Sequence, residues 1–152
     1  MMPSLPLAAN GETLVPSATT VTSAGDLPML QEWAYDFENN ELLTDDSGAP
    51  YLVSGNEALK IWLYWAIITE RYIWRANSRD YGTEIDCMRG INASQAIKSS
   101  ELERTIREAI NICQYVKSID KLDLSLQDGV VVVDITIKSI YQEGWVELHV
   151  KV

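Results

Sequence analysis

Basic residues are absent from the first 59 positions of this 152-residue chain, although those positions contain nine aspartates and glutamates. The whole chain carries 12 basic and 22 acidic residues, which gives a net charge of −10. Nucleic acids are bound through basic surfaces that neutralise phosphates, so the acidic front half argues against a nucleic-acid partner. Solubility alone explains this charge, and the alternative is docking on a basic protein surface.

Histidine and cysteine are scarce, with one and two residues respectively. A metal site needs several convergent ligands, and His149 with two distant cysteines does not provide them. Cys87 and Cys113 have neither metal-binding spacing nor the number expected of a disulfide framework, so we expect two buried thiols. The P-loop, GxGxxG and GxSxG motifs are missing as well. We therefore expect no metal and no other cofactor.

No apolar run reaches the roughly 18 residues that a membrane-spanning helix needs. The N-terminus has no positively charged region followed by a long apolar run, so no signal peptide is predicted. We expect a protein that is kept in a reducing compartment until it is assembled or released, with no membrane partner.

Carboxylates close together in the sequence raise the question of an enzyme, because glycoside hydrolysis uses two of them. Four arginines interleave with these carboxylates. An ion pair keeps a carboxylate ionised, whereas a general acid needs a raised pKa. The pattern favours structural ion pairing, and a peptidoglycan hydrolase stays open as the enzymatic alternative. The residues concerned are Glu70, Asp80, Glu84, Asp86, Arg71, Arg75, Arg79 and Arg89.

The segment 57–82, EALKIWLYWAIITERYIWRANSRDYG, is predicted to begin with the central helix of the fold. Ser54 and Glu57 have the spacing of a capping box at its start. One helical face is apolar, and the opposite face is apolar too. The first face consists of Leu59, Trp62, Leu63, Ala66 and Ile67, and the second of Ile61, Tyr64, Trp65 and Ile68. A helix that is apolar nearly all round is buried on nearly all sides, which in a small domain usually needs a neighbouring chain.

Trp, Tyr and Arg dominate the energetics of protein interfaces, so the tryptophans here are favoured as interface anchors over a stacking platform for sugars or bases. We predict a partner interface at the central helix and the charged segment behind it. Its residues are Trp62, Trp65, Ile68, Glu70, Arg71, Arg75 and Tyr81.

Residues 1–29 are rich in Ser, Thr, Ala, Gly and Pro and cannot build a core alone. They are either a disordered tail or an extended arm that orders on a partner. In the segment that follows, Trp33, Tyr35 and Phe37 alternate with small or acidic residues, which predicts a strand. Turn residues at Asn39–Asn40 and Ser47–Gly48 would let residues 51–53 pair back onto it.

A second helix is predicted from a capping box at Ser100 and Glu103, with short helical turns before it in residues 83–98. A three-stranded meander follows, with strands around 122–126, 130–138 and 146–152 and turns at Asp128–Gly129 and Glu143–Gly144. The predicted fold class is α+β: two main helices packed on a C-terminal antiparallel β-meander. The domains are an extended arm at 1–29 and one folded domain at 30–152. The inner stripe of the second helix is Leu102, Ile106, Ala109, Ile110 and Cys113.

The last predicted strand still alternates at the final residue, so we expect its edge to stay uncovered by the chain itself. An uncovered strand edge accepts an extended segment from another chain through main-chain hydrogen bonds. We predict strand addition there. The apolar residues that fix this strand are Val146, Leu148, Val150 and Val152.

The order of these elements resembles a known family. WAYDFENNELL, EALKIWLYWAIITER, DYG, SELERTIREAI and the terminal meander follow one another as in the baseplate wedge proteins of contractile tails, the "lysozyme-like" or sheath-initiator subunits. The resemblance covers residues 31–152 and is closest to the version in defective prophages and phage-tail-like bacteriocins. Its most specific elements are Thr69–Arg71 and Asp80–Gly82. Many relatives carry Glu-Pro-Arg after the second helix, and the resemblance assigns this motif a role in the wedge core bundle. Here the stretch reads Cys113-Gln114-Tyr115-Val116, so the motif is absent and that role is not expected of it.

The resemblance implies a structural subunit without enzymatic activity, located in the inner baseplate of a phage tail or phage-tail-like particle. Its partners would be the other wedge subunits, the hub and spike proteins and the tail sheath protein. Six copies would surround the hub, assemble in the host cytoplasm, and offer a strand to the first sheath ring. A small soluble adaptor unrelated to tails is the second alternative.

Overall fold

The computed structural model describes residues 27–90, 94–141 and 145–152. The predicted arm up to residue 26 and the predicted turn at Glu143–Gly144 lie outside the described residues.

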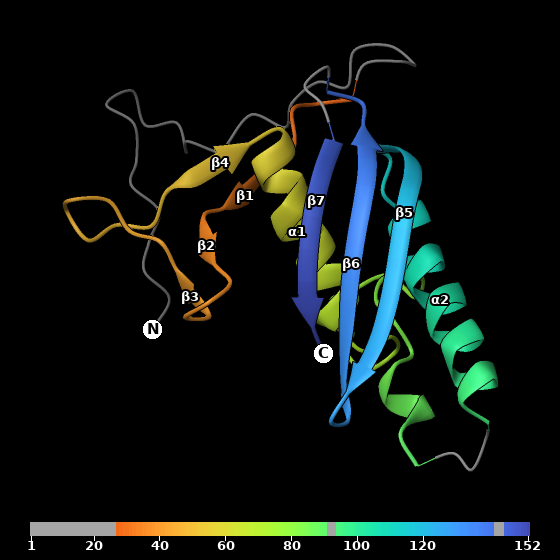
Figure 1. Cartoon of the computed structure of the whole chain (residues 1–152). Helices are drawn as coiled ribbons and strands as arrows, with labels where there is room; N and C mark the ends of the chain where they lie inside the picture. Colours follow the sequence, from red (N-terminus) through yellow and green to blue (C-terminus); the bar gives the residue numbers. More distant parts are fainter. Residues whose placement is uncertain (1–26, 91–93, 142–144) are drawn as a thin grey trace.

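The described chain is built on a three-stranded antiparallel sheet in the order β5-β6-β7. The strands are β5 (Val116–Gln127), β6 (Val130–Ser139) and β7 (Trp145–Lys151). Helices α1 (Asn56–Ile68) and α2 (Gln95–Asn111) lie on one side of this sheet, α1 behind β7 and α2 beside β5 (Figure 1). The predicted α+β class, with two main helices on a terminal meander, is confirmed.

The core lies between the helices and one face of the sheet. Successive strand side chains point to opposite faces, so every second residue of β6 and β7 is buried here. From the helices, the apolar stripes that were predicted face the same layer, and Cys113 is buried with them as expected. The core residues that are most fully buried are Leu59, Leu63, Ile67, Ile106, Ile110, Val133, Ile137, Val146 and Val150.

Neither predicted capping box forms. Helix α1 begins after Gly55, whose φ of 67° turns the chain, and Ser54 belongs to strand β4 (Leu52–Ser54), so no side chain caps the helix. Helix α2 begins at Gln95, which places Ser100 inside it. Glu103 instead pairs with Arg107 across one helical turn, 2.8 Å apart. A capping box is a local signal. It is overridden in α2 because the helix already begins at Gln95, and in α1 because Ser54 is held in strand β4 opposite Gln31.

The segment before α1 forms a narrow ribbon beside the sheet (Figure 1). Strand β1 (Gln31–Trp33) pairs with β4, and β2 (Tyr35–Asp36) pairs with β3 (Glu41–Leu42). The predicted pairing of residues 51–53 is confirmed for Leu52 and Val53. The predicted single strand breaks at buried Ala34, whose amide and carbonyl bond to two different neighbours.

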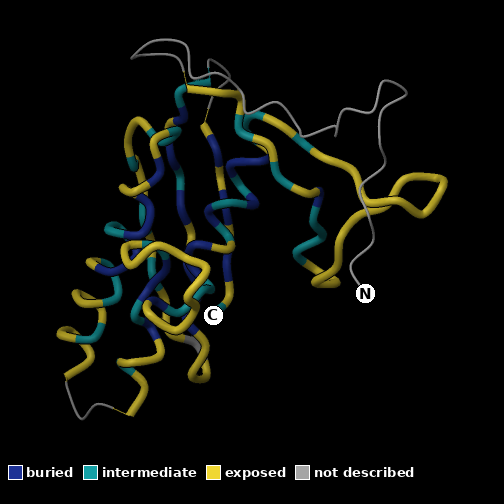
Figure 2. Tube along the Cα trace, turned by 180° about the vertical axis from the view of Figure 1, so that it is seen from behind, coloured by how far each residue is buried: buried dark blue, intermediate teal, exposed yellow. Residues whose placement is uncertain are grey.

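Between α1 and α2 the chain makes a long loop. The charged segment expected behind the central helix is not helical, because α1 ends at Ile68. Residues 72–80 are all exposed, as the view from behind shows (Figure 2). A single 3-10 turn, η1 (Asp86–Met88), represents the predicted helical turns of residues 83–90.

Candidate functional site

Strand β7 forms one edge of the sheet, since among the described residues it pairs only with β6. Val131 and Val152 exchange two backbone hydrogen bonds, of 2.9 and 2.8 Å. Because such pairs alternate along an antiparallel ladder, the amides of every second β7 residue point away from β6. The outward row therefore belongs to Trp145, Glu147, His149 and Lys151.

The predicted strand-addition residues hold this edge in place. Val146, Leu148 and Val150 are buried in the core, and Val152 is half-buried. A slip of one residue would expose that whole apolar set, so the register is fixed. The sequence identified these anchoring side chains but could not show that the free backbone groups belong to the residues between them.

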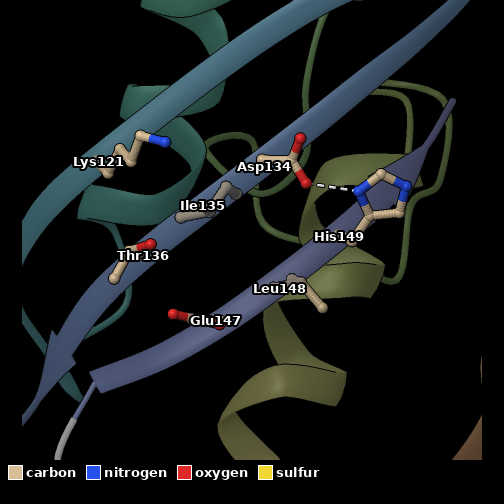
Figure 3. A pocket seen from close by; sticks show the side chains of 7 residues that line it. All are labelled: Lys121, Asp134, Ile135, Thr136, Glu147, Leu148 and His149. Carbon is tan, nitrogen blue, oxygen red and sulfur yellow. Dashed lines mark hydrogen bonds and ion pairs between the residues drawn. The ribbon is translucent and has the colours of Figure 1, made fainter.

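The outer face of β7 is polar and charged. His149 lies opposite Asp134 on β6, with its Nδ1 2.5 Å from the carboxylate, at one end of a shallow hollow in the sheet surface (Figure 3). Lys121 and Glu147 line the same hollow. Trp145 packs under the Lys138 ammonium, 4.6 Å from the ring centre. Charged side chains on an edge strand discourage unspecific pairing while leaving the backbone available.

The second apolar face of α1 is covered partly by the chain itself. Trp65 is 38% exposed, and its ring meets Tyr35 at 5.1 Å between centroids. Trp62 is half-buried and packs edge-on against Tyr81 at 5.5 Å. Ile68 is half-buried as well. The N-terminal ribbon thus supplies part of the cover that we had expected from a neighbouring chain.

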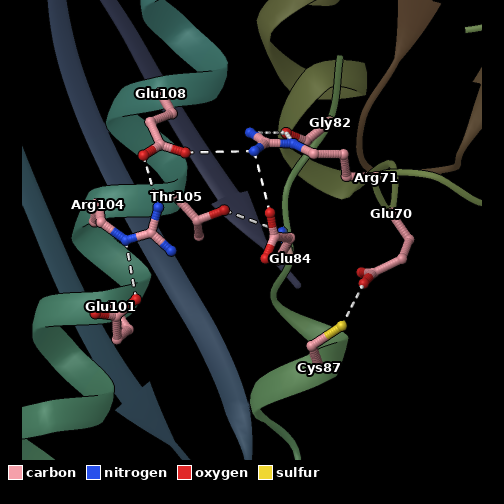
Figure 4. A network of polar contacts seen from close by, with 9 residues as sticks. All are labelled: Glu70, Arg71, Gly82, Glu84, Cys87, Glu101, Arg104, Thr105 and Glu108. Atoms are coloured by element: carbon pink, nitrogen blue, oxygen red, sulfur yellow. Dashed lines mark hydrogen bonds and ion pairs between the residues drawn. The ribbon is translucent and has the colours of Figure 1, made fainter. Parts of the chain in front are cut away.

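Arg71 brings the two most specific motifs together (Figure 4). Its side chain is buried, and Nη2 and Nε donate to the Gly82 carbonyl at 3.0 and 3.3 Å. Its Nη1 pairs with Glu84 at 3.1 Å and with Glu108 of α2 at 3.3 Å. The segment Thr69–Arg71 is thereby tied to Asp80–Gly82 and to the second helix. We call these contacts of Arg71 with Gly82, Glu84 and Glu108 the clasp.

Gly82 is required for this clasp by its backbone conformation. Its φ is 100°, and a Cβ at this position would lie 2.6 Å from the backbone oxygen of Thr69. The amide of Arg71 donates to the Thr83 carbonyl, and the amide of Thr83 donates to the Thr69 carbonyl. The exposed loop therefore projects from a closely paired base.

Three of the four carboxylates that raised the question of an enzyme, Glu70, Glu84 and Asp86, form structural contacts. Glu84 pairs with Arg71, and Asp86 pairs with Arg89 at 3.1 Å, as the sequence predicted for this cluster. Glu70, also half-buried, instead accepts hydrogen bonds from the Asp86 amide and the Cys87 thiol. The hydrogen bond to Glu70 is the main cause that raises the pKa of the Cys87 thiol. Cys87 is exposed, so its predicted burial was wrong.

Tyr81 is half-buried beside Trp62 of α1 and lies near enough to Glu32 of the N-terminal ribbon to be affected by its charge. Burial, followed by the nearby charge of Glu32, raises the pKa of Tyr81 to about 12. The phenol therefore stays neutral at physiological pH, and Thr69 forms a hydrogen bond with it.

The loop displays an exposed surface for which the sequence indicated Trp74 and Arg75 but missed Tyr72 and Ile73. Tyr72, Ile73 and Trp74 are 70%, 62% and 64% exposed. Tyr72 adopts a φ of 70°, a conformation that is uncommon for a non-glycine residue. Within the described part of the chain, neither Arg75 nor Arg79 forms an ion pair, and both are exposed. Apolar residues continuing past the end of α1 were the available signal, but a longer helix explained them equally well.

No group of three His, Cys, Asp or Glu side chains that could hold a metal occurs in residues 27–90, 94–141 and 145–152. In the same residues, no helix has the length and apolar character needed to cross a membrane.

A family model described as "contractile injection system sheath initiator" matches residues 31–142. The chain is also 26% identical over 120 residues to the phage-like element PBSX protein XkdS of Bacillus subtilis (strain 168), an alignment that covers 78% of this chain and 79% of that protein. Since the family model spans most of the sequence, this chain belongs to the sheath initiator family of contractile injection systems.

Proposed function

We propose that this structural, sheath-initiating protein starts the sheath by accepting an extended sheath segment along the free edge of β7. The observation that carries the proposal is the backbone register: four alternating residues, from Trp145 to Lys151, turn their amides and carbonyls outward. Each main-chain bond contributes about 0.5–1.5 kcal/mol net. A segment that spans this row would gain several of these bonds at once. Val146, Leu148 and Val150 are buried in the core and would keep the strand in position as the segment binds.

The second part of the proposal concerns how this chain attaches to the baseplate. We place the wedge and hub contacts on the second face of α1 and on the loop behind it, because apolar and arginine side chains are exposed there. Six copies around the hub would present six β7 edges to the first sheath ring, after assembly in the host cytoplasm. Residues 1–29 would order on the same partners. The proposed contact residues are Trp62, Trp65, Ile68, Glu70, Arg75 and Tyr81, joined by Tyr72, Ile73 and Trp74. Arg71, which was predicted with them, is buried, so it would support this surface by holding the loop rather than by touching the partner.

Proline substitutions on β7 test the strand-addition step. The amides of His149 and Lys151 both point outward, so His149→Pro and Lys151→Pro each remove one bond donor at the edge. Edge strands tolerate proline where the N–H faces solvent, so the domain should fold. Baseplates should form, and sheath should fail to polymerise on them.

The matched controls are His149→Ala and Lys151→Ala, which remove the same side chains and keep the amides. Both should support full-length sheath in electron micrographs. If the folded proline variants also build full-length sheath, strand addition at this edge is not how the sheath starts.

A further inference from the structure

A groove runs beside the free edge of β7, on the side away from β6. Its second wall is the turn between β2 and β3, residues 37–40, and its floor is formed by Phe37 of this turn together with Lys60 and Tyr64 of α1. The groove has a volume of about 680 Å³. It is lined by Phe37, Glu38, Asn40, Lys60, Tyr64, Glu147, Leu148, His149 and Lys151.

The second wall is held firmly before any partner arrives. The Tyr64 hydroxyl donates to Oδ1 of Asn40 at 3.1 Å, and the rings of Phe37 and Tyr64 lie 4.7 Å apart. Asp36 accepts bonds from the Glu38 and Asn39 amides, at 2.8 and 3.3 Å, which closes the turn. The Asn39 side-chain amide donates to Asp36 Oδ2 at 2.8 Å and is the main cause that lowers the pKa of the Asp36 carboxyl, followed by the two backbone bonds, so the carboxylate stays ionised and bonded at neutral pH. A preformed wall reduces the ordering cost of binding.

The floor offers apolar surface to one face of a strand placed beside β7. Side chains of such a strand would alternate, with every second one pointing toward the helices. There they would meet Phe37 and Tyr64, both half-buried, together with the half-buried stem of Lys60. The rim carries both signs, with Glu38 facing the strand that contains Lys151.

We propose that the turn of residues 37–40 clamps the incoming sheath strand against β7, and that the Phe37–Tyr64 floor selects a large apolar side chain in that strand. The inference rests on the strand addition proposed above. The groove borders β7 from Glu147 to Lys151. That length matches about five residues of extended chain, or roughly 17 Å. Specificity for the sheath then comes from this floor, while affinity comes from the backbone row.

The test uses the full-length chain and the purified sheath protein of the same particle, with affinity measured by biolayer interferometry. Phe37→Ala and Tyr64→Ala should each weaken sheath binding at least tenfold, about 1.4 kcal/mol. Tyr64→Phe keeps the ring and releases only Asn40, so it should have a smaller effect. Ile97→Ala, which removes an exposed apolar side chain on α2 away from the groove, should leave sheath binding unchanged. Unchanged affinity in the folded Phe37→Ala and Tyr64→Ala variants would overturn the clamp.

Hydrogen exchange separates the clamp from strand addition itself. Sheath binding should protect the amides of Glu147, His149 and Lys151 and also those of residues 38–40. Protection at β7 without any change in the turn would refute the clamp alone, whereas no protection at β7 would refute the strand addition beneath it. If the turn is already protected in the free chain and deletion of residues 1–26 removes that protection, the groove belongs to the chain's own N-terminal segment, and the proposal fails.

Discussion

Replacing Arg71 with alanine tests how far one guanidinium holds the exposed loop to the core. The substitution leaves the Gly82 carbonyl without its two donors, at 3.0 and 3.3 Å. A buried polar group without a partner costs about 1–3 kcal/mol. The carboxylates of Glu84 and Glu108 keep 31% and 43% of their side-chain exposure, so each lost ion pair adds only a fraction of that cost.

The expected loss of unfolding free energy for Arg71→Ala is about 3 kcal/mol. In a domain of this size it lowers the melting temperature by about 6–12 °C. Arg71→Lys should recover only part of the loss, because an ammonium cannot reproduce the planar fork of donors. Urea unfolding followed by tryptophan fluorescence, with thermal melts by circular dichroism, measures both variants.

Arg104→Ala is the matched control. Arg104 pairs with Glu101 and Glu108 on the exposed surface of α2, at 2.9 and 2.6 Å. Exposed pairs of this kind contribute about 1 kcal/mol or less. If Arg71→Ala destabilises the protein no more than Arg104→Ala does, the clasp is not what fixes the loop.

Two further pairs of substitutions test the close approach at Gly82 and the proposed interface on α1. Gly82→Ala should lower the free energy of unfolding in urea by at least about 2 kcal/mol, because the position combines a positive φ with a close backbone approach. Gly90→Ala, at a position with a φ of 86° and open space around it, should lower it by about 1 kcal/mol. Equal losses would contradict the close approach at Gly82. Trp65→Ala and Ile68→Ala should reduce incorporation into baseplates at least as strongly as they reduce stability, and normal assembly of both folded variants would place the wedge contact elsewhere.

The parts of the fold that depend on short-range pattern could be predicted from sequence. Alternation in residues 130–152 gave the meander, and Asp128–Gly129 gave its first hairpin, where both residues adopt the positive φ values, 51° and 83°, that such a turn needs. The inner stripe of α2 followed from helical spacing. The start of α2 was predicted from the capping box at Ser100, but the helix begins at Gln95, because residues before a local capping signal can also adopt the helical conformation.

The surfaces depend on contacts between distant residues. The chain's own Tyr35 covers part of the second face of α1, and the sequence could not place the two side by side. In the sequence, Arg71 is one of several charged residues behind the central helix, yet in the structure it is the buried one, and its contacts hold the base of the loop together. The outward amide row of β7 follows from register, and the groove beside it follows from the path of the β2–β3 turn.

The most direct measurement is a cryo-electron microscopy map of the particle's baseplate with its first sheath ring in the extended state. The account predicts an extended sheath segment hydrogen-bonded to Glu147, His149 and Lys151. A sheath ring that contacts this chain only through β5, through α2 or through side chains, with the β7 edge left open, would contradict it.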